Sequence, residues 1–401
     1  MKGVLLHQVT SKVYSKIKSE CIMKLLMVGP TPEPYTGQSI SFNKLKDSFS
    51  VDDEVSVHHV ETSPSAKGAH VTGEASYARL KDTLAIFCKY TFLLVIVKPD
   101  VVYLTKGSTK SGFLRDLVLL IVKKFFSKRT KFVVHLKGGN YDIFYERSSK
   151  LIKLWIRYFV KEVDLVIVLG DSLVKMYDFS PEIKNKIIVV KNALPILPNS
   201  LGLHQKTEKI IFLYLSNLIY SKGYTTIIEA AKILHDNGVR NFEVVLAGEF
   251  MASPDDPKGY DFHAEMSRNI KNFNSNKYPY LKYVGKVNGE TKSNLLREAD
   301  ILILPTNYHV EGQPVSIIEA MAYSCAIITT NYRSIPDIVD SHNALFIEFG
   351  NVPQLVSTME KAIKSPGMLD KMKKASIARY ESEHIWSKHY DRMKYVLFQL
   401  K

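Results

Sequence analysis

Two glutamates in the second half of the chain carry the clearest chemical signal in the sequence. An apolar run at residues 300–306 leads into a loop that contains Glu311, and an apolar helical pattern at residues 315–323 contains Glu319. The backbone amides at the start of such a helix lack partners within it and can bind an anion. Carboxylates beside that turn would repel a phosphate, but they can accept hydrogen bonds from the hydroxyls of a sugar and a ribose. The pattern therefore predicts a site for a phosphorylated sugar compound.

Glu319 could instead be an ordinary helix residue that faces solvent. Its neighbours Ile317, Ile318, Ala320 and Met321 are apolar. An unpaired carboxylate among such side chains would be costly. This surrounding favours a binding role for Glu319.

Two further loops have the composition of anion-binding turns. Lys222 and Gly223 come between a strand-like run and a helix that starts near Thr225. A lysine at a helix start is unfavourable for the helix dipole unless an anion lies there. Gly37, in the loop at residues 29–39, precedes another helix and lets backbone come close to a ligand. Taken alone, each loop could also be a solvated surface turn.

With these motifs in place, the sequence LPTNYHVEGQPVSIIEAMA at residues 304–322 resembles the E-x7-E motif of retaining glycosyltransferases of family 4, which have the GT-B fold. The resemblance covers residues 23–401 and includes the loops at Gly37, at Gly138-Gly139 and at Lys222-Gly223. It implies transfer of a sugar from a nucleotide-diphosphate donor to a saccharide or lipid-linked acceptor, with retention of configuration. Bacterial relatives mostly build cell-surface polysaccharides, so the resemblance implies such a pathway.

The resemblance also implies a role for each matching residue. Glu319 would bind the ribose hydroxyls, while Glu311 and the amides after it would hold the transferred sugar. Lys222 would neutralise the diphosphate, and Val287 would lie beside the base. The residues expected to bind the donor are Gly37, Asn217, Lys222, Val287, Gly312, Gln313, Val315 and Glu319, and those expected to act in catalysis are Glu311, Lys222 and Lys137.

Two positions depart from the family's pattern. The family commonly has an arginine in a Gly-Arg-Leu stretch, which here reads Ser-Asn-Leu around Asn217, and Arg333 is a speculative substitute for the missing charge. The family also tends to place a histidine before the paired glycines, where this chain has Lys137. His135, two residues earlier in an apolar run, reads as a buried structural residue. Lys137 could meet the donor's phosphate or an acidic acceptor.

We expect neither a metal nor a cofactor, because no Asp-x-Asp signature and no His/Cys cluster with zinc spacing is visible. Lys222 and the amides at residues 312–315 would then stabilise the charge on the leaving diphosphate. The family is thought to attack from the leaving-group face, with a diphosphate oxygen accepting the acceptor's proton.

Parallel sheets must position these motifs, because the chain alternates short β-branched runs with longer helical patterns. We predict an α/β protein of two facing doubly wound, Rossmann-like domains, with ligands bound where the carboxyl ends of the strands meet. The predicted parts are a flexible leader at 1–22, domains at 23–198 and 199–375, and a helical segment at 376–401 that could cross back to the first domain. The predicted strands are 24–29, 100–104, 132–136, 165–169, 187–191, 210–215, 243–247, 280–284, 301–305 and 326–329.

Composition supports this reading, because 401 residues with 46% apolar and 23% charged residues suit two globular domains. The three cysteines are far apart, which argues for a reducing compartment. No apolar run reaches the roughly 20 residues needed to span a bilayer. We therefore expect a cytoplasmic protein.

The net charge of +14 is concentrated in the first half, where residues 101–160 hold 13 basic and 3 acidic groups. Trp155 and Phe159 lie in an apolar stretch among basic residues that recur every three or four positions. This pattern predicts that residues 114–161 dock on the anionic inner face of the cell membrane. The alternative is a solvated helix face. The basic residues are Arg147, Lys150, Lys153, Arg157 and Lys161.

Other classes of protein remain as alternatives. A nucleotide-sugar epimerase or hydrolase of the same fold would act without an acceptor, and the spacing of the glutamates argues against it. A nucleic-acid-binding protein would explain the basic charge, but no helix-turn-helix, RNP-type aromatic motif or zinc finger is visible. We therefore expect no nucleic-acid partner.

Overall fold

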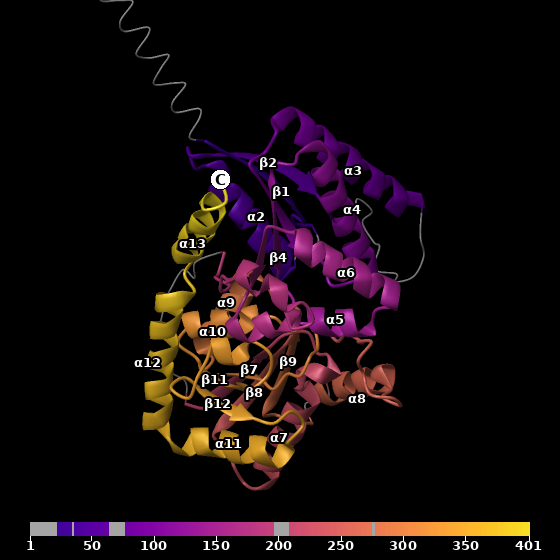
Figure 1. Ribbon diagram of the computed structural model, residues 1–401. Helices are drawn as coiled ribbons and strands as arrows, with labels where there is room; N and C mark the ends of the chain where they lie inside the picture. The colour runs from indigo at the N-terminus through magenta and orange to yellow at the C-terminus, as the bar shows by residue number, and fades with distance from the viewer. Residues whose placement is uncertain (1–21, 34–35, 64–76, 196–207, 275–276) are drawn as a thin grey trace, which may run out of the picture.

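The computed structural model describes residues 22–33, 36–63, 77–195, 208–274 and 277–401 (Figure 1). Almost all of the predicted leader at 1–22 and the predicted domain boundary at 198/199 lie outside these residues. The described part forms two α/β domains, one above the other in Figure 1, each built on a parallel sheet.

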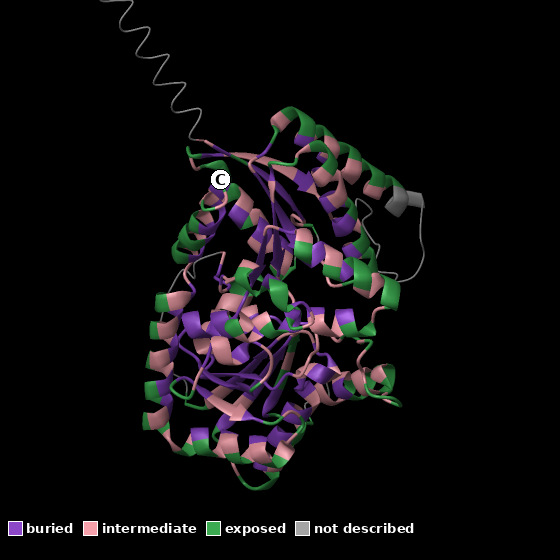
Figure 2. Ribbon diagram, viewed as in Figure 1, coloured by how far each residue is buried: buried purple, intermediate pink, exposed green. Residues whose placement is uncertain are grey.

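The first domain has a six-stranded parallel sheet with the order β2-β1-β3-β4-β5-β6. Burial is nearly complete along its central strands, as expected for a parallel sheet covered on both faces (Figure 2). Its elements are β1 (Met23–Gly29), α2 (Gly37–Ser50), β2 (Val55–Glu61), α3 (Tyr77–Val97), β3 (Val101–Lys106), α4 (Lys110–Phe126), β4 (Lys131–Leu136), α5 (Tyr141–Arg147), α6 (Lys150–Glu162), β5 (Leu165–Val168), the 3₁₀ helices η1 (Asp171–Tyr177) and η2 (Pro181–Lys186), and β6 (Ile187–Val189).

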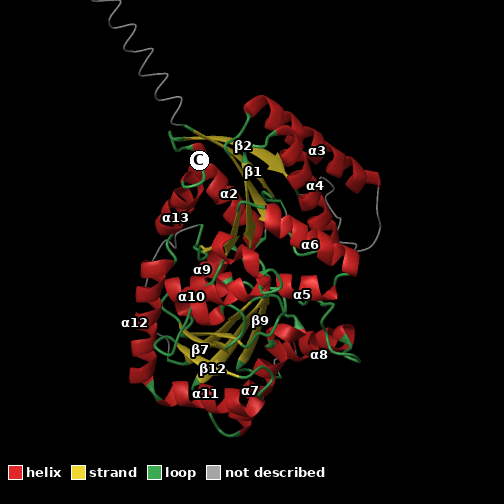
Figure 3. Cartoon of the chain, in the orientation of Figure 1, coloured by secondary structure: helices red, strands yellow, loops and turns green. Residues whose placement is uncertain are grey.

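The second domain repeats this design of strands flanked by helices (Figure 3). Its six-stranded sheet has the order β12-β11-β10-β7-β8-β9. Its elements are β7 (Ile210–Leu215), η3 (Tyr220–Lys222), α7 (Tyr224–Asp236), β8 (Phe242–Ala247), α8 (Phe262–Asn274), β9 (Leu281–Gly285), α9 (Gly289–Glu298), β10 (Ile301–Leu304), α10 (Val315–Ala322), β11 (Ala326–Thr330), η4 (Ile335–Asp337), β12 (Ala344–Ile347) and α11 (Val352–Lys364). Two doubly wound sheets confirm the predicted fold class.

All ten predicted strands are present, with ends that differ by at most two residues. The structure adds β2 and β12, which the sequence analysis did not identify. Both are edge strands. β2 carries His58, His59 and Glu61, so it lacks the apolar run of a central strand. β12 is apolar and has four residues, like the central strand β10, and its pattern was overlooked.

Three helices of the first domain cover one face of its sheet. The buried cores assign α3, α4 and α6 to this face and α2 to the opposite one. Right-handed crossovers explain the division, because the chain moves outward from β1 to β2 and then back across β1 to β3. Phe159 on α6 is fully buried in this core, so its predicted place on a membrane-facing surface was wrong.

The C-terminal helices join the two domains along one side of the molecule (Figure 1). The helix α12 (Pro366–Glu383) packs on the second domain, and the predicted boundary at 375/376 falls inside it. The helix α13 (Trp386–Phe398) packs on the first domain, where Met393 and Leu397 are fully buried. Trp386 Nε1 donates to Ser48 Oγ at 3.0 Å, and Lys394 pairs with Asp52 at 2.7 Å. No described helix is both long enough and apolar enough to cross a bilayer.

Replacing Leu397 with alanine tests whether α13 holds the first domain together. Leu397→Ala leaves a cavity in the core and should lower the free energy of unfolding by about 2–5 kcal/mol. The matched control on the same helix is Tyr395→Ala, because the Tyr395 side chain is mostly exposed and its loss should cost less than about 0.5 kcal/mol. Urea unfolding measures both. Equal effects would show that α13 does not pack as described.

Candidate functional site

Glu311 lies in the loop that connects β10 to α10, at the carboxyl end of the second sheet. Its side chain is only 10% exposed and pairs with Lys222, with 3.3 Å between Oε2 and Nζ. The Glu311 amide donates to the Tyr308 carbonyl at 2.9 Å, which closes the turn before the helix. The first two predicted catalytic residues are therefore in contact.

Lys222 ends the short helix η3, just before α7. Its Nζ also donates to Ser216 Oγ at 3.1 Å and lies 5.1 Å from the centre of the Tyr308 ring. Gly223 follows with a φ of +78°, and a Cβ there would overlap the Pro305 carbonyl oxygen. Only glycine suits this position, which holds Lys222 against the end of β10.

Glu319 forms the second ion pair of the site. Its Oε1 lies 2.6 Å from Nζ of Lys292, a residue of α9 that the sequence analysis did not identify. Both side chains are half-buried, and Glu319 is one turn inside α10, as predicted. No local pattern marks Lys292, because its partner lies 27 residues away on another helix.

The loop after β4 in the first domain touches the Glu311 loop backbone to backbone. The Gly139 amide donates to the Val310 carbonyl at 3.1 Å. A Cβ on Gly139 would overlap the carbonyl oxygen of Glu311, and one on Gly312 would overlap that of Lys137. The paired-glycine loop of the first domain thus places Lys137 beside the start of α10.

Lys137 is half-buried and meets the predicted donor-binding loop through Asn192. Its Nζ lies 3.4 Å from Asn192 Oδ1, and the Asn192 amide donates to Gln313 Oε1 at 2.8 Å. Burial lowers the pKa of Lys137 from its ordinary 10.5 to about 7. The amine therefore titrates near neutral pH.

Three histidines near Lys137 are buried and have structural contacts. His135 is fully buried, as expected, and its Nδ1 lies 2.7 Å from the Tyr103 hydroxyl. Burial lowers the pKa of His384 to about 4 and that of His389 to about 3, so both are neutral at pH 7. Their Nδ1 atoms donate to the carbonyls of residues 192 and 191. No local sequence pattern marks this pair of histidines.

The N-termini of α2 and α10 face each other across the two domains. A Cβ on Gly37 would lie 3.8 Å from Val315 Cγ2. Thr36 caps α2 by accepting a hydrogen bond from the Ser39 amide at 3.1 Å. Two helix N-termini are therefore brought together, and their dipoles favour an anion between them.

The remaining predicted residues lie further from the two glutamates. Asn217 accepts a hydrogen bond from the Tyr214 hydroxyl through its carbonyl, and Val287 is half-buried against the second core. Arg333 donates to Asp142 Oδ2 of α5 at 2.8 Å. This ion pair crosses between the domains, and the role of Arg333 as a substitute for the missing arginine stays a prediction. In the described residues no group of three His, Cys, Asp or Glu side chains is arranged to hold a metal, and metal independence stays a prediction.

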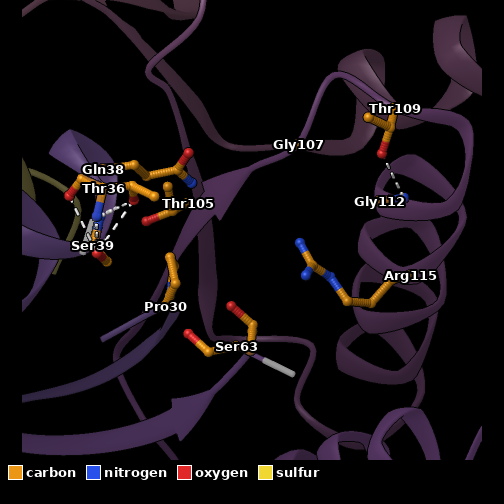
Figure 4. Close-up of a pocket in the computed structure, with 11 residues that line it drawn as sticks. Pro30, Thr36, Gln38, Ser39, Ser63, Thr105, Gly107, Thr109, Gly112 and Arg115 are labelled. Atoms are coloured by element: carbon orange, nitrogen blue, oxygen red, sulfur yellow. Dashed lines mark hydrogen bonds between the residues drawn. The ribbon is translucent and has the colours of Figure 1, made fainter. Parts of the chain in front are cut away.

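A cavity of about 240 Å³ opens in the first domain between the N-termini of α2 and α4 (Figure 4). Its polar lining comes from serine and threonine hydroxyls, and Arg115 lies at one side. Arg115 donates to Asp116, which is fully buried. Thr105 Oγ1 at the end of β3 is buried without a hydrogen-bond partner. The lining residues include Thr36, Gln38, Ser39, Ser63, Thr105, Thr109, Gly112 and Arg115.

Comparisons with known proteins agree with this geometry. Residues 202–379 match the family model described as glycosyl transferases group 1. The fold is similar to a glycosyltransferase from Rickettsia africae (13% identity, TM-score 0.68, covering 94% of this chain and 98% of that one). It is similar to HepE of Anabaena in complex with UDP (14% identity, TM-score 0.67, covering 94% of this chain and 100% of that one). It is also similar to sucrose-phosphate synthase from Thermosynechococcus elongatus (14% identity, TM-score 0.65, covering 94% of this chain and 99% of that one).

A search of curated protein sequences finds no match to the chain. At these identities the structural neighbours show the fold, and the family model covers the domain that carries both glutamates. The chain is thus similar to group 1 glycosyl transferases over residues 202–379, and it shares its two-domain fold with solved glycosyltransferases.

Proposed function

We propose that the protein transfers a sugar from a nucleotide-diphosphate donor to a saccharide or lipid-linked acceptor, with retention of configuration and without a metal ion. The single observation that carries the proposal is the contact of Lys222 with Glu311 beside the free amides of α10. A cation and helix amides suit the diphosphate, and a carboxylate at the same point suits a sugar hydroxyl.

The donor side of the site is the loop and helix start at residues 311–319. Glu319 would accept hydrogen bonds from the ribose hydroxyls, for which it must exchange its contact with Lys292. Lys292 would then be free to turn toward the diphosphate and supply the charge that the residue at 217 does not. HepE was crystallised with UDP and with UDP-glucose, which supports a nucleotide-sugar donor and makes these two compounds the first to test.

The acceptor side would be the hydroxyl-lined cavity of the first domain. Serine and threonine hydroxyls can donate to and accept from the hydroxyls of a saccharide. In the reaction the bond from the anomeric carbon to the diphosphate oxygen breaks, and a bond to the acceptor oxygen forms. The acceptor's proton passes to the leaving diphosphate, so no protein nucleophile is required. Lys222 and the α10 amides would stabilise the charge that develops.

A nucleotide-sugar epimerase or hydrolase of the same fold is the alternative. It would release a free sugar or an isomer without any acceptor. Analysis of the products with and without saccharide acceptors separates the two functions. We infer cell-surface polysaccharide synthesis as the pathway, and a lipid-linked acceptor at an anionic membrane surface as its setting.

Removing Glu319 should weaken nucleotide binding while the fold persists. Two lost charge-assisted hydrogen bonds would cost about 2–4 kcal/mol, so Glu319→Ala should raise the Kd for the preferred nucleoside diphosphate about 30- to 1,000-fold. Glu381→Ala is the matched control, because Glu381 is exposed on α12. Calorimetric titration of UDP and the other nucleoside diphosphates measures this. An unchanged Kd would exclude the ribose-binding role.

Removing Lys222 should slow turnover more than it weakens substrate binding, because charge on the leaving group peaks in the transition state. Loss of one such group typically lowers kcat about 100- to 1,000-fold. The assay measures release of the nucleoside diphosphate in the presence of EDTA. Lys361→Ala is the control, because the Lys361 side chain is exposed on α11. Since Lys222 also pairs with Glu311, the variants Glu311→Gln and Lys222→Ala/Glu311→Gln complete a double-mutant cycle. A normal kcat in Lys222→Ala would contradict the proposal.

The pH dependence of donor binding should report Lys137. With its pKa at about 7, the amine is cationic below pH 7 and neutral above it. Affinity for an intact nucleotide sugar should therefore fall between about pH 6 and about pH 8, and binding should take up protons. The Lys137→Met variant should lose this dependence, whereas Lys128→Met, at an exposed site, should keep it. The same pH profile in Lys137→Met would show that Lys137 does not meet the donor.

A further inference from the structure

The outer side of α3, α4 and α6 exposes an unusual amount of apolar surface. These three helices lie side by side on one face of the first sheet, in the order of the strands that they connect. Of the fifteen exposed large hydrophobic side chains in the described residues, eleven belong to them. Phe92 and Ile96 on α3, Phe125 on α4, and Leu151 and Leu154 on α6 are each more than half exposed.

This surface, which we call the α3–α4–α6 face, is also strongly basic. Lys89, Lys150, Arg157 and Lys161 are exposed on its helices, and Lys128 is exposed just after α4. The described side chains of the three helices include no exposed carboxylate, because their acidic residues are buried or half-buried. The face therefore combines apolar side chains with a net positive charge, although the exposed Glu182 of η2 lies near Arg157 and Lys161.

A basic hollow of about 620 Å³ lies at the C-terminal end of α4, between Val95 of α3 and residues 400–401 that follow α13. Phe126 contributes an apolar wall, and Lys98, Lys128 and Arg129 contribute cations. One carboxylate, that of Asp100, also lines it, but it accepts a hydrogen bond from a backbone amide at 2.8 Å. Apolar and cationic groups at one hollow suit a lipid headgroup with the start of its acyl chain.

We infer that the α3–α4–α6 face docks on the surface of an anionic lipid bilayer. Charge complementarity selects this occupant, since basic residues around exposed apolar side chains are attracted to anionic headgroups while the apolar groups enter the interface. A second copy of the chain would instead bring two positive faces together. Each basic residue near an anionic leaflet contributes about a fivefold gain in binding.

Docking would also deliver a lipid-linked acceptor to the cavity, a step that rests on the proposed function. α4 carries both surfaces: Gly112 and Arg115 line the cavity, and Leu114 and Val118 are exposed on the outer face. Arg115 and Phe125 are ten residues apart, which spans about 15 Å along a helix. An acceptor anchored in the bilayer could therefore reach the cavity along α4.

Vesicle flotation with the full chain tests this inference. The protein should float with vesicles of phosphatidylcholine mixed with phosphatidylglycerol at low salt, detach as salt rises, and ignore pure phosphatidylcholine. The charge variant Lys150→Gln/Arg157→Gln/Lys161→Gln should bind about 100-fold more weakly. The apolar variant Phe92→Ser/Phe125→Ser/Leu154→Ser should lose at least about tenfold.

Matched controls replace exposed side chains elsewhere. Lys361→Gln/Lys371→Gln/Lys374→Gln removes three charges from α11 and α12, and Val51→Ser/Tyr395→Ser removes exposed apolar groups; both should float like the parent. No flotation with anionic vesicles, or equal flotation of all variants, would overturn the inference. So would a dimer, seen by light scattering, that the apolar variant abolishes.

The outcome is independent of the proposed function. Vesicle binding needs no donor, and calorimetric binding of a nucleoside diphosphate needs no vesicle. A protein that floats but binds no nucleotide would retain the docking surface and lose the proposed reaction. A protein that binds a nucleotide but does not float would retain the proposed reaction and lose the docking surface.

Discussion

The site depends on one backbone contact between the domains, where Gly139 meets the carbonyls of Val310 and Glu311. Neither Gly139 nor Gly312 leaves room for a Cβ, so the two loops can approach only because both positions are glycine. The contact places Lys137 beside the start of α10 and brings Gly37 near Val315. The groups that could hold a diphosphate thus come from both domains, although both glutamates belong to the second.

Charge pairing explains how this site can exist without its ligand. Glu311 is nearly buried and would be costly alone, and Lys222 compensates it at 3.3 Å. Glu319 has the same relation to Lys292 at 2.6 Å. In the proposed function, sugar and ribose hydroxyls would replace each lysine as partner of the carboxylate, and each lysine would then meet a phosphate. A nucleotide sugar is a ligand that supplies both kinds of group at once.

Sequence patterns predicted the parts of this site that are local and missed the parts that are not. The apolar run at β10, the loop of Glu311 and the helix of Glu319 follow one another in the chain, so their types and spacing were readable. Lys292 was not, because α9 reaches Glu319 only through the packing of the second domain. The ion pair between Arg333 and Asp142 could not be predicted either, because the two residues are 191 positions apart in the chain. Phe159 was misplaced because a helix period identifies two faces without saying which one meets the sheet.

Two covalent links join the domains, and they lie next to each other. The first leaves the first domain after residue 192, and the second is the turn between α12 and α13 at residues 384–385. The Leu194 amide donates to the His384 carbonyl at 3.2 Å, and the ring of His384 donates to the carbonyl of residue 192. Neutral histidines suit this junction, because their pKa values near 4 and 3 keep a charge from forming in a buried place.

Several further contacts between the domains in the described residues are polar, among them the hydrogen bond from Asn192 to Gln313. Besides the Gly139 contact, Ser172 donates to Asp337 at 3.0 Å and Arg333 pairs with Asp142 at 2.8 Å. A rotation about the paired links would separate these groups and leave both sheets intact. Each broken contact would expose polar groups that water can satisfy, so the cost of opening is modest compared with unfolding either core. In the proposed function, such a rotation would let the site release its product without loss of the fold.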